Sequence, residues 1–195
     1  MHRFVPSCTA GLLLTLPVLS LAAPAPTAPQ LWHQIETLRK THAIMAGTKP
    51  YQPGSRTVDA YTIDLANQSA NGAIRTAGGI VKTTRYPNGA LVVKENFNLH
   101  KKLTGVTAML KLNGYDKGDR NWIMAAYSPA GKVVAYGKVP ACIACHTMVR
   151  KQDFVFAPPP TQLISAAVWK GFFPAQTISP AYAKLLRQHP EAIIK

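Results

Sequence analysis

The chain has 195 residues, of which 47% are hydrophobic, and 22 Lys and Arg against 8 Asp and Glu give it a formal net charge of +14. This length and hydrophobic content suit one globular core, and they exclude two large domains, a disordered chain and a collagen-like chain. The basic residues are spread along the chain and are not interleaved with stacking aromatic residues. We therefore expect no nucleic-acid partner.

Residues 1–22 have the pattern of a secretory signal peptide. A basic start at Arg3 precedes the apolar stretch 12–21, which is too short to span a bilayer, and small residues follow up to a predicted cleavage point after about Ala22. Cys8 lies before the apolar stretch and would be removed with it. We expect a periplasmic protein without a membrane span, in which residues 23–29 form a Pro/Ala tether and residues 30–195 form a single domain.

The pattern after Pro29 predicts a helix. Its apolar residues recur at 3.6-residue spacing, and Gly47 is placed to end it; the stripe consists of Leu31, Ile35, Leu38, His42 and Met45. Near the other end of the chain, residues 161–170 predict a second helix that ends at Gly171. Ser179 and Pro180 then open a third short helix that stops at His189.

The middle of the chain predicts strands, at residues 61–65, 90–97, 106–112, 121–127 and 132–139. A turn at 87–89 leads into the second of these, and residues 128–131 carry the Pro and Gly of a hairpin turn between the last two. We expect a mainly β, α+β fold in which an antiparallel sheet has a few flanking helices.

One motif carries chemistry, the segment Cys142-Ile143-Ala144-Cys145-His146, which follows the last hairpin. A CxxCH segment on one helical turn places two thiols where each can form a thioether with a haem vinyl group, and the adjacent imidazole can reach the iron. The motif predicts one covalently attached haem c, with Cys142 and Cys145 as attachment points and His146 as the axial iron ligand.

Three other interpretations of the two cysteines are open. A thioredoxin-like redox pair would begin a helix after a parallel strand, whereas this pair follows an antiparallel hairpin. A zinc site would need further ligands, and the remaining histidines are scattered singly. A structural disulfide would close a loop too small to constrain much of the unfolded chain.

Several segments around the motif occur in an order that resembles a known family; they are residues 86–97, 101–107, 114–116, 121–122, 131–133, 142–146 and 153–156. The chain resembles the cytochrome P460 family, which includes the beta-type cytochromes c-prime. The resemblance covers about residues 30–157. Its most selective parts are a Tyr-Pro-Asn-Gly turn before the strand that contains Val-Lys-Glu, and Asp-Phe-Val-Phe after the haem motif.

The resemblance implies an antiparallel β fold, a homodimer, and one haem whose iron has His on one side and an open site on the other. In cytochrome P460 itself a lysine is bonded to the haem ring and the enzyme oxidises hydroxylamine, and Lys94 is the matching residue. Alternation places Lys94 on the strand face of Val92, where an inward amine would be buried, unprotonated and nucleophilic. A lysine that points to solvent is the alternative, and the beta-type c-prime relatives have no such bond.

Hydroxylamine oxidation needs a group that removes protons near the iron, a task suited to a carboxylate. Residues 131–141, before the motif, contain no Asp or Glu, and Glu95 lies on the strand face opposite to Lys94. The candidates that the sequence leaves open are Asp64, Asp116 and Asp153.

A methionine in the sixth position would instead make the iron an electron-transfer centre with a partner protein. Met45, Met109 and Met124 are the candidates, although each suits a core position better, and Met148 is too close to His146 to reach the other side of the ring. The aromatic candidates for the walls of an open site are Phe97, Phe154 and Phe156. We expect an exported monohaem protein that binds or redox-converts small nitrogen species, hydroxylamine or nitric oxide. The sequence does not decide between an enzyme and a ligand binder, and an electron-transfer cytochrome is the alternative.

Overall fold

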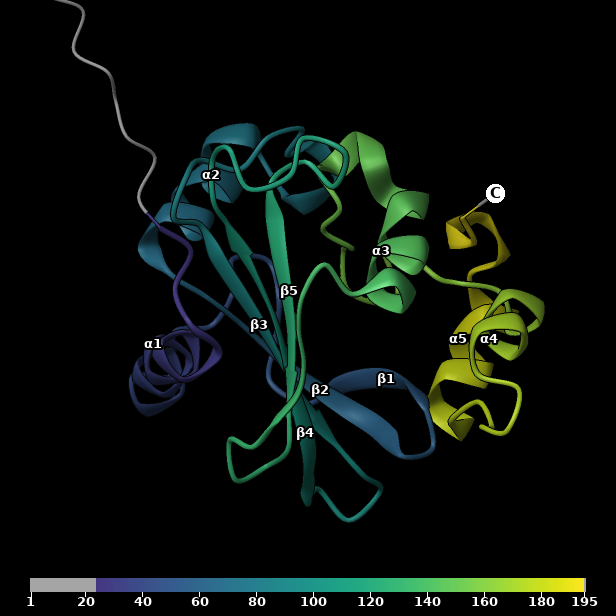
Figure 1. Ribbon diagram of the computed structural model, residues 1–195. Helices are drawn as coiled ribbons and strands as arrows, with labels where there is room; N and C mark the ends of the chain where they lie inside the picture. Colours follow the sequence, from purple (N-terminus) through teal and green to yellow (C-terminus); the bar gives the residue numbers. More distant parts are fainter. Residues whose placement is uncertain (1–23, 195) are drawn as a thin grey trace, which may run out of the picture.

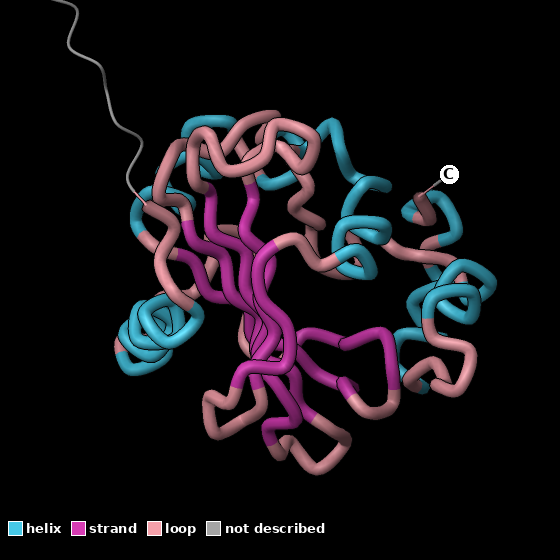
Figure 2. The backbone as a smooth tube through the Cα atoms, in the orientation of Figure 1, coloured by secondary structure: helices cyan, strands magenta, loops and turns pink. Residues whose placement is uncertain are grey.

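The computed structural model describes residues 24–194, so the predicted signal peptide lies outside the described residues. The centre of the fold is a six-stranded antiparallel sheet, whose strands are magenta in Figure 2. The strands follow one another in chain order. The strands are β1 (Gln52–Arg56), β2 (Asp59–Ala66), β3 (Leu91–Phe97), β4 (Leu103–Lys111), β5 (Trp122–Tyr127) and β6 (Val133–Gly137). The predicted mainly β, α+β class with an antiparallel sheet is confirmed.

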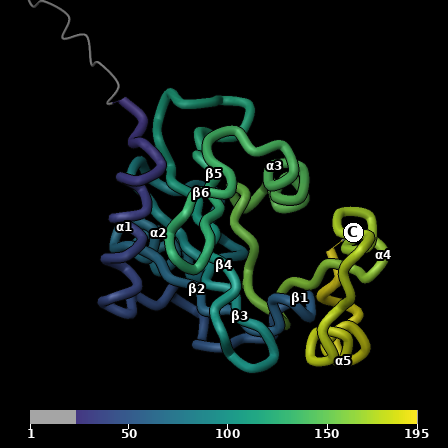
Figure 3. Tube along the Cα trace, turned by 60° about the horizontal axis from the view of Figure 1, so that its bottom comes forward, coloured from purple at the N-terminus to yellow at the C-terminus, as the bar shows by residue number. Residues whose placement is uncertain are grey.

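Helices lie on both sides of this sheet in Figure 1. They are α1 (Ala28–Lys40), α2 (Gln68–Ala77), α3 (Pro140–His146), α4 (Ala166–Phe172) and α5 (Pro180–Gln188), with the 3-10 turns η1 (Ile80–Lys82), η2 (Thr147–Gln152) and η3 (Pro190–Ala192) between or after them. Helix α1 lies along one face, whereas α3, α4 and α5 lie on the opposite side, as the turned view in Figure 3 also shows. None of the helices within residues 24–194 has the length and apolar character needed to cross a membrane.

Helix α1 covers an apolar cluster on the first face of the sheet. Leu31 and Ile35, at 0% exposure, pack against strand residues that include Leu91, Val93 and Val106. The Tyr127 hydroxyl donates a hydrogen bond of 2.8 Å to the Ala28 carbonyl and so ties the start of the helix to β5. The predicted apolar stripe is therefore confirmed for its first half.

Both ends of α1 differ from the expectation. Thr27 and Gln30 form a capping box, so the helix begins at Ala28, inside the segment predicted as a tether. The helix ends at Lys40, and the prediction that it continues to Gly47 was wrong. His42 has a φ of 46°, and beyond it Ile44 pairs with Leu65 of β2. The apolar spacing of residues 41–47 also suits a helix, but Ile44 in this segment forms a bridge with β2 instead.

The C-terminal segment packs on the edge strand β1 (Figure 3). Ile178 pairs with Arg56, the Thr57 N–H donates to the Thr177 carbonyl at 3.0 Å, and the buried Ser179 hydroxyl donates to the Gly54 carbonyl at 2.5 Å. These contacts cover backbone groups that an edge strand would otherwise expose.

Of the two helices in this segment, α5 follows its sequence signals and α4 departs from them. The predicted Ser179 cap of α5 is confirmed, because its hydroxyl accepts from the Tyr182 N–H at 3.2 Å. Helix α4 begins five residues later than the predicted 161–170 and runs through Gly171 to Phe172, so the prediction that Gly171 ends it was wrong. Its Ser165 cap starts it at Ala166, while Leu163 forms a parallel bridge with Ile193.

Candidate haem-binding site

The CxxCH motif forms helix α3, which starts directly after the last strand of the sheet. Pro140 occupies its first turn, where the missing N–H breaks no helical hydrogen bond. Cys142 and Cys145 lie three residues apart, and both are free, partly buried thiols. Burial raises the pKa of each thiol, and the positive charge of Lys94 lowers it in part. The two side chains are thus available in the form that adds to a vinyl group.

His146 ends this helix with its ring held by one hydrogen bond. Its Nδ1 lies 2.6 Å from the Phe154 carbonyl oxygen, which can only accept, so Nδ1 carries the proton. Nε2 then has a free lone pair, the form in which imidazole binds iron. Burial lowers the pKa of His146 to about 4, the Phe154 carbonyl raises it in part and the Lys94 charge lowers it further, so the ring is neutral near pH 7.

The sheet face that α3 packs against is apolar in one half. Val92, Met109 and Met124 form a buried cluster there, against which Cys142 and Ile143 pack. The motif is therefore fixed to the sheet through its own cysteine-bearing face.

The next row of the same sheet face has three polar side chains and two alanines, and only its lysine is long. Register pairs its members directly across five strands, and we call the row the open rung; it consists of Asp64, Lys94, Thr107, Ala126 and Ala135. Lys94 is exposed and the other four are partly exposed. Short side chains on a solvent-accessible strip beside two free thiols suit a large flat ring such as haem.

Lys94 shares a strand face with Val92, as alternation predicts, and its side chain is exposed, as in the solvent-facing alternative that the sequence left open. Val92 is 8% exposed and Lys94 is exposed. Its neighbours on the rung, Asp64 and Thr107, are too short to cover it. Cys142 packs against the cluster that contains Val92, so the face that Lys94 shares with Val92 is the motif side of the sheet.

The structure separates the three carboxylates that the sequence left open. Asp116 pairs with Lys138 at 2.6 Å near the surface, and Asp153 pairs with Lys111 in the interior. Asp64 lies on the open rung directly opposite Lys94, and its Oδ2 accepts from the Gln52 amide at 3.0 Å. Burial raises the pKa of Asp64, while the Lys94 charge and the Gln52 hydrogen bond lower it. Asp64 is the one of these three carboxylates that shares the rung with Lys94.

The methionine and phenylalanine candidates occupy different positions. Met45, Met109 and Met124 are buried in the apolar cluster, as their expected core role requires. Phe154 belongs to the same cluster at 0% exposure, and Phe97 packs against Tyr51 with ring centroids 5.2 Å apart. Phe156 lies edge-on to His146 at 5.2 Å, so it contacts the ring of the predicted axial ligand.

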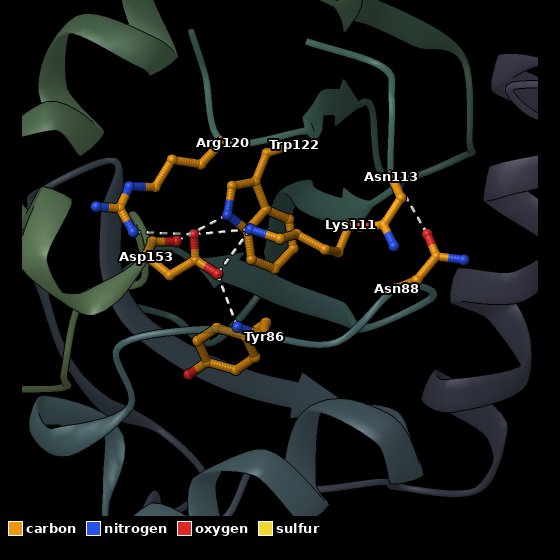
Figure 4. A network of polar contacts seen from close by, with 7 residues as sticks. All are labelled: Tyr86, Asn88, Lys111, Asn113, Arg120, Trp122 and Asp153. Carbon is orange, nitrogen blue, oxygen red and sulfur yellow. Dashed lines mark hydrogen bonds and ion pairs between the residues drawn. The ribbon is translucent and has the colours of Figure 1, made fainter. Parts of the chain in front are cut away.

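Sequence reasoning missed the network around Asp153, which Figure 4 shows. The Lys111 Nζ lies 2.7 and 2.6 Å from the two carboxylate oxygens, and the Tyr86 N–H donates to Oδ2 at 2.7 Å. The Trp122 Nε1–H donates to the Asp153 carbonyl at 2.7 Å. No spacing signal links Lys111 and Asp153, which are 42 residues apart.

The alternatives for the two cysteines gain nothing from this geometry. Residues 24–194 contain no group of three or more His, Cys, Asp or Glu side chains that could hold a metal ion alone. The two thiols are not joined to each other.

Comparison with protein families matches residues 61–157 to the cytochrome P460 family. The chain belongs to this family. The cytochrome P460 match runs from β2 through the motif to the residue after Phe156, and it implies a haem cofactor. The matched residues do not include α1, β1 or the C-terminal helices of this cytochrome P460 family member. Comparison with curated proteins gave no match.

Proposed function

We propose that this protein is an exported, periplasmic haem c protein that binds or redox-converts small nitrogen species such as hydroxylamine or nitric oxide. Cys142 and Cys145 would hold one haem by adding their S–H groups across its two vinyl groups, an addition that releases nothing. His146 would bind the iron through Nε2. The observation that carries the proposal is the 2.6 Å contact between His146 Nδ1 and the Phe154 carbonyl, because it leaves Nε2 free beside two free thiols.

The bound haem would supply an iron centre that binds small nitrogen ligands and exchanges electrons with them. The burial of Met45, Met109 and Met124 in the apolar cluster supports an open site in place of a methionine-ligated electron-transfer centre. A homodimer and a partner protein that takes up electrons belong to the same proposal.

Two groups of the open rung would act on the ligand side. The Asp64 carboxylate would accept a proton from a bound nitrogen species, since its pKa is raised toward the range where a carboxylate works as a general base. The exposed Lys94 amine would bond to the edge of the ring: a C–N bond would replace one amine N–H and one ring C–H, and a peroxide oxidant would take up the two electrons and two protons.

Haem attachment is tested on the full chain produced with a c-type haem maturation system. Acidified organic solvent should leave haem on the protein and should release it from the double variant Cys142→Ala/Cys145→Ala. Cys8→Ala is the matched control and should retain haem, because Cys8 lies in the predicted signal peptide. Release of haem from the unaltered chain would contradict the proposal.

The ferrous spectrum then tests the open site. A five-coordinate high-spin haem that takes up nitric oxide supports the proposal, and a six-coordinate low-spin haem supports the electron-transfer alternative. Peptide mapping separates enzyme from binder: haem joined to a fragment with Lys94 supports hydroxylamine oxidation, and haem on the cysteine fragment alone supports a nitric oxide binder.

A further inference from the structure

The ion pair between Lys111 and Asp153 is unusual because it is buried. The two side chains are 6% and 1% exposed, and the amine lies within 2.7 Å of both carboxylate oxygens. Arg120 adds a more distant charge at 3.9 Å. The cost of removing two charges from water offsets much of their attraction, so a buried ion pair contributes little net free energy to folding. Stability alone therefore does not explain this pair.

Asp153 is held at both its side chain and its backbone. The Tyr86 N–H and the Lys111 amine bind the carboxylate, and the Trp122 indole binds the carbonyl (Figure 4). The Lys111 amine also lies 4.7 Å from the centre of the Trp122 ring. The position of this one residue is thus fixed from the ends of β4 and β5 and from the loop before β3.

The backbone at this point has a conformation that needs such support. Asp153 and Phe154 have φ values of 53° and 71°, a left-handed region that side-chain-bearing residues seldom occupy. The two residues turn the chain back toward α3, and the Phe154 carbonyl thereby reaches His146 Nδ1.

We propose that Lys111 and Asp153 are positioning residues for the axial ligand: their ion pair holds the left-handed turn that presents the Phe154 carbonyl to His146. The inference rests on the proposed function, in which His146 Nε2 binds the haem iron. A carbonyl that accepts from Nδ1–H fixes the tautomer and orientation of the ring and increases the basicity of Nε2. Lys111 and Asp153 would thus influence the reduction potential of the iron without contacting it.

The iron–histidine stretching band of the ferrous holoprotein, measured by resonance Raman spectroscopy, tests this role. Lys111→Met and Asp153→Asn should each move the band to lower frequency and raise the reduction potential, because the bond to Phe154 weakens. Asn suits the left-handed conformation and can still accept from Tyr86, so Asp153→Asn removes the charge with little other change.

The double variant Lys111→Met/Asp153→Asn separates positioning from folding. It leaves no unpaired buried charge, so its unfolding temperature should lie close to that of the unaltered protein while its band stays shifted. A double-variant band that coincides with the unaltered one would overturn the inference, even where a single variant fails to fold.

Arg39→Met is the control, since it breaks a 2.7 Å ion pair with Glu95 that joins α1 to β3 and should not move the band. A shift as large in this control would also overturn the inference. If the unaltered holoprotein shows no iron–histidine band, the five-coordinate, His146-ligated iron of the proposed function fails and the inference fails with it, whereas an unchanged band in the double variant contradicts the positioning role alone.

Discussion

In the proposed function Asp64 accepts a proton at the open rung during hydroxylamine oxidation, and this role depends on its protonation state. Only the carboxylate can accept a proton. Burial raises its pKa above the ordinary 3.8, against the opposing effects of Lys94 and Gln52. Hydroxylamine oxidation should therefore fall as the pH drops through this raised pKa, at a higher pH than an exposed Asp would give.

Asp64→Asn should reduce the rate of hydroxylamine oxidation about 100-fold and remove this acid limb. The measurement is the rate of hydroxylamine oxidation as a function of pH, with Asp116→Asn as the control, because Asp116 is paired with Lys138 away from the rung. An acid limb that persists in Asp64→Asn would show that another group accepts the proton.

For single residues, the sequence could predict a functional role only where that role depends on local spacing. The CxxCH spacing is sufficient to nominate Cys142, Cys145 and His146, because all three lie on one helical segment. The exposure of Lys94 depends on the lengths of side chains from neighbouring strands. The partner of Asp153 depends on how β4 meets the chain 42 residues later, which no local pattern encodes.

Elements were predictable where an apolar period or a cap was present. The strands β2 to β6 and the cap of α5 follow such signals. Helix α2 gives no apolar stripe, since Asn71 is among its three buried residues and Gly72 lies at its centre. Strand β1 has the sequence Gln-Pro-Gly-Ser-Arg, which disfavours a strand, and it forms because β2 and the C-terminal segment pair with it from both sides.

The turn between β5 and β6 depends on a glycine for two reasons. Gly131 has a φ of 82°, and a Cβ there would lie 2.4 Å from the Trp32 ring of α1. Gly131→Ala should therefore lower the free energy of unfolding by about 3 kcal/mol, through backbone strain and overlap with Trp32.

Gly89→Ala is the matched control in urea unfolding. Gly89 has a φ of 78° with no atom within 4 Å of an added Cβ, so only the backbone strain of about 1 kcal/mol applies. Equal losses in the two variants would show that the hairpin turn does not pack tightly on α1.

The C-terminal segment is joined to the sheet through its contacts with β1, and Ser179 makes one of these contacts. Its hydroxyl donates to the Gly54 carbonyl and accepts from the Tyr182 N–H, at 0% exposure. Ser179→Ala should lower the free energy of unfolding by about 2 kcal/mol, because both a helix cap and a buried hydrogen bond are lost.

Ser165→Ala provides the comparison in the same thermal or urea unfolding experiment. Ser165 caps α4 through the Val168 N–H at 3.3 Å and is partly exposed, so its loss should be about 1 kcal/mol. A Ser179→Ala loss no larger than this would mean that the C-terminal segment adds little to the stability of the sheet.

The strand order of the sheet also determines how the chain can fold. Each pairing joins strands that are consecutive in sequence, so the sheet can grow strand by strand over chain separations shorter than that of the C-terminal contact. The contact between Thr57 and Thr177 spans 120 residues, and closing such a loop costs about 2 kcal/mol more in entropy than closing one of about ten residues. Docking of the C-terminal segment should therefore follow the rate-limiting step, so that Ser179→Ala speeds unfolding and leaves the folding rate unchanged.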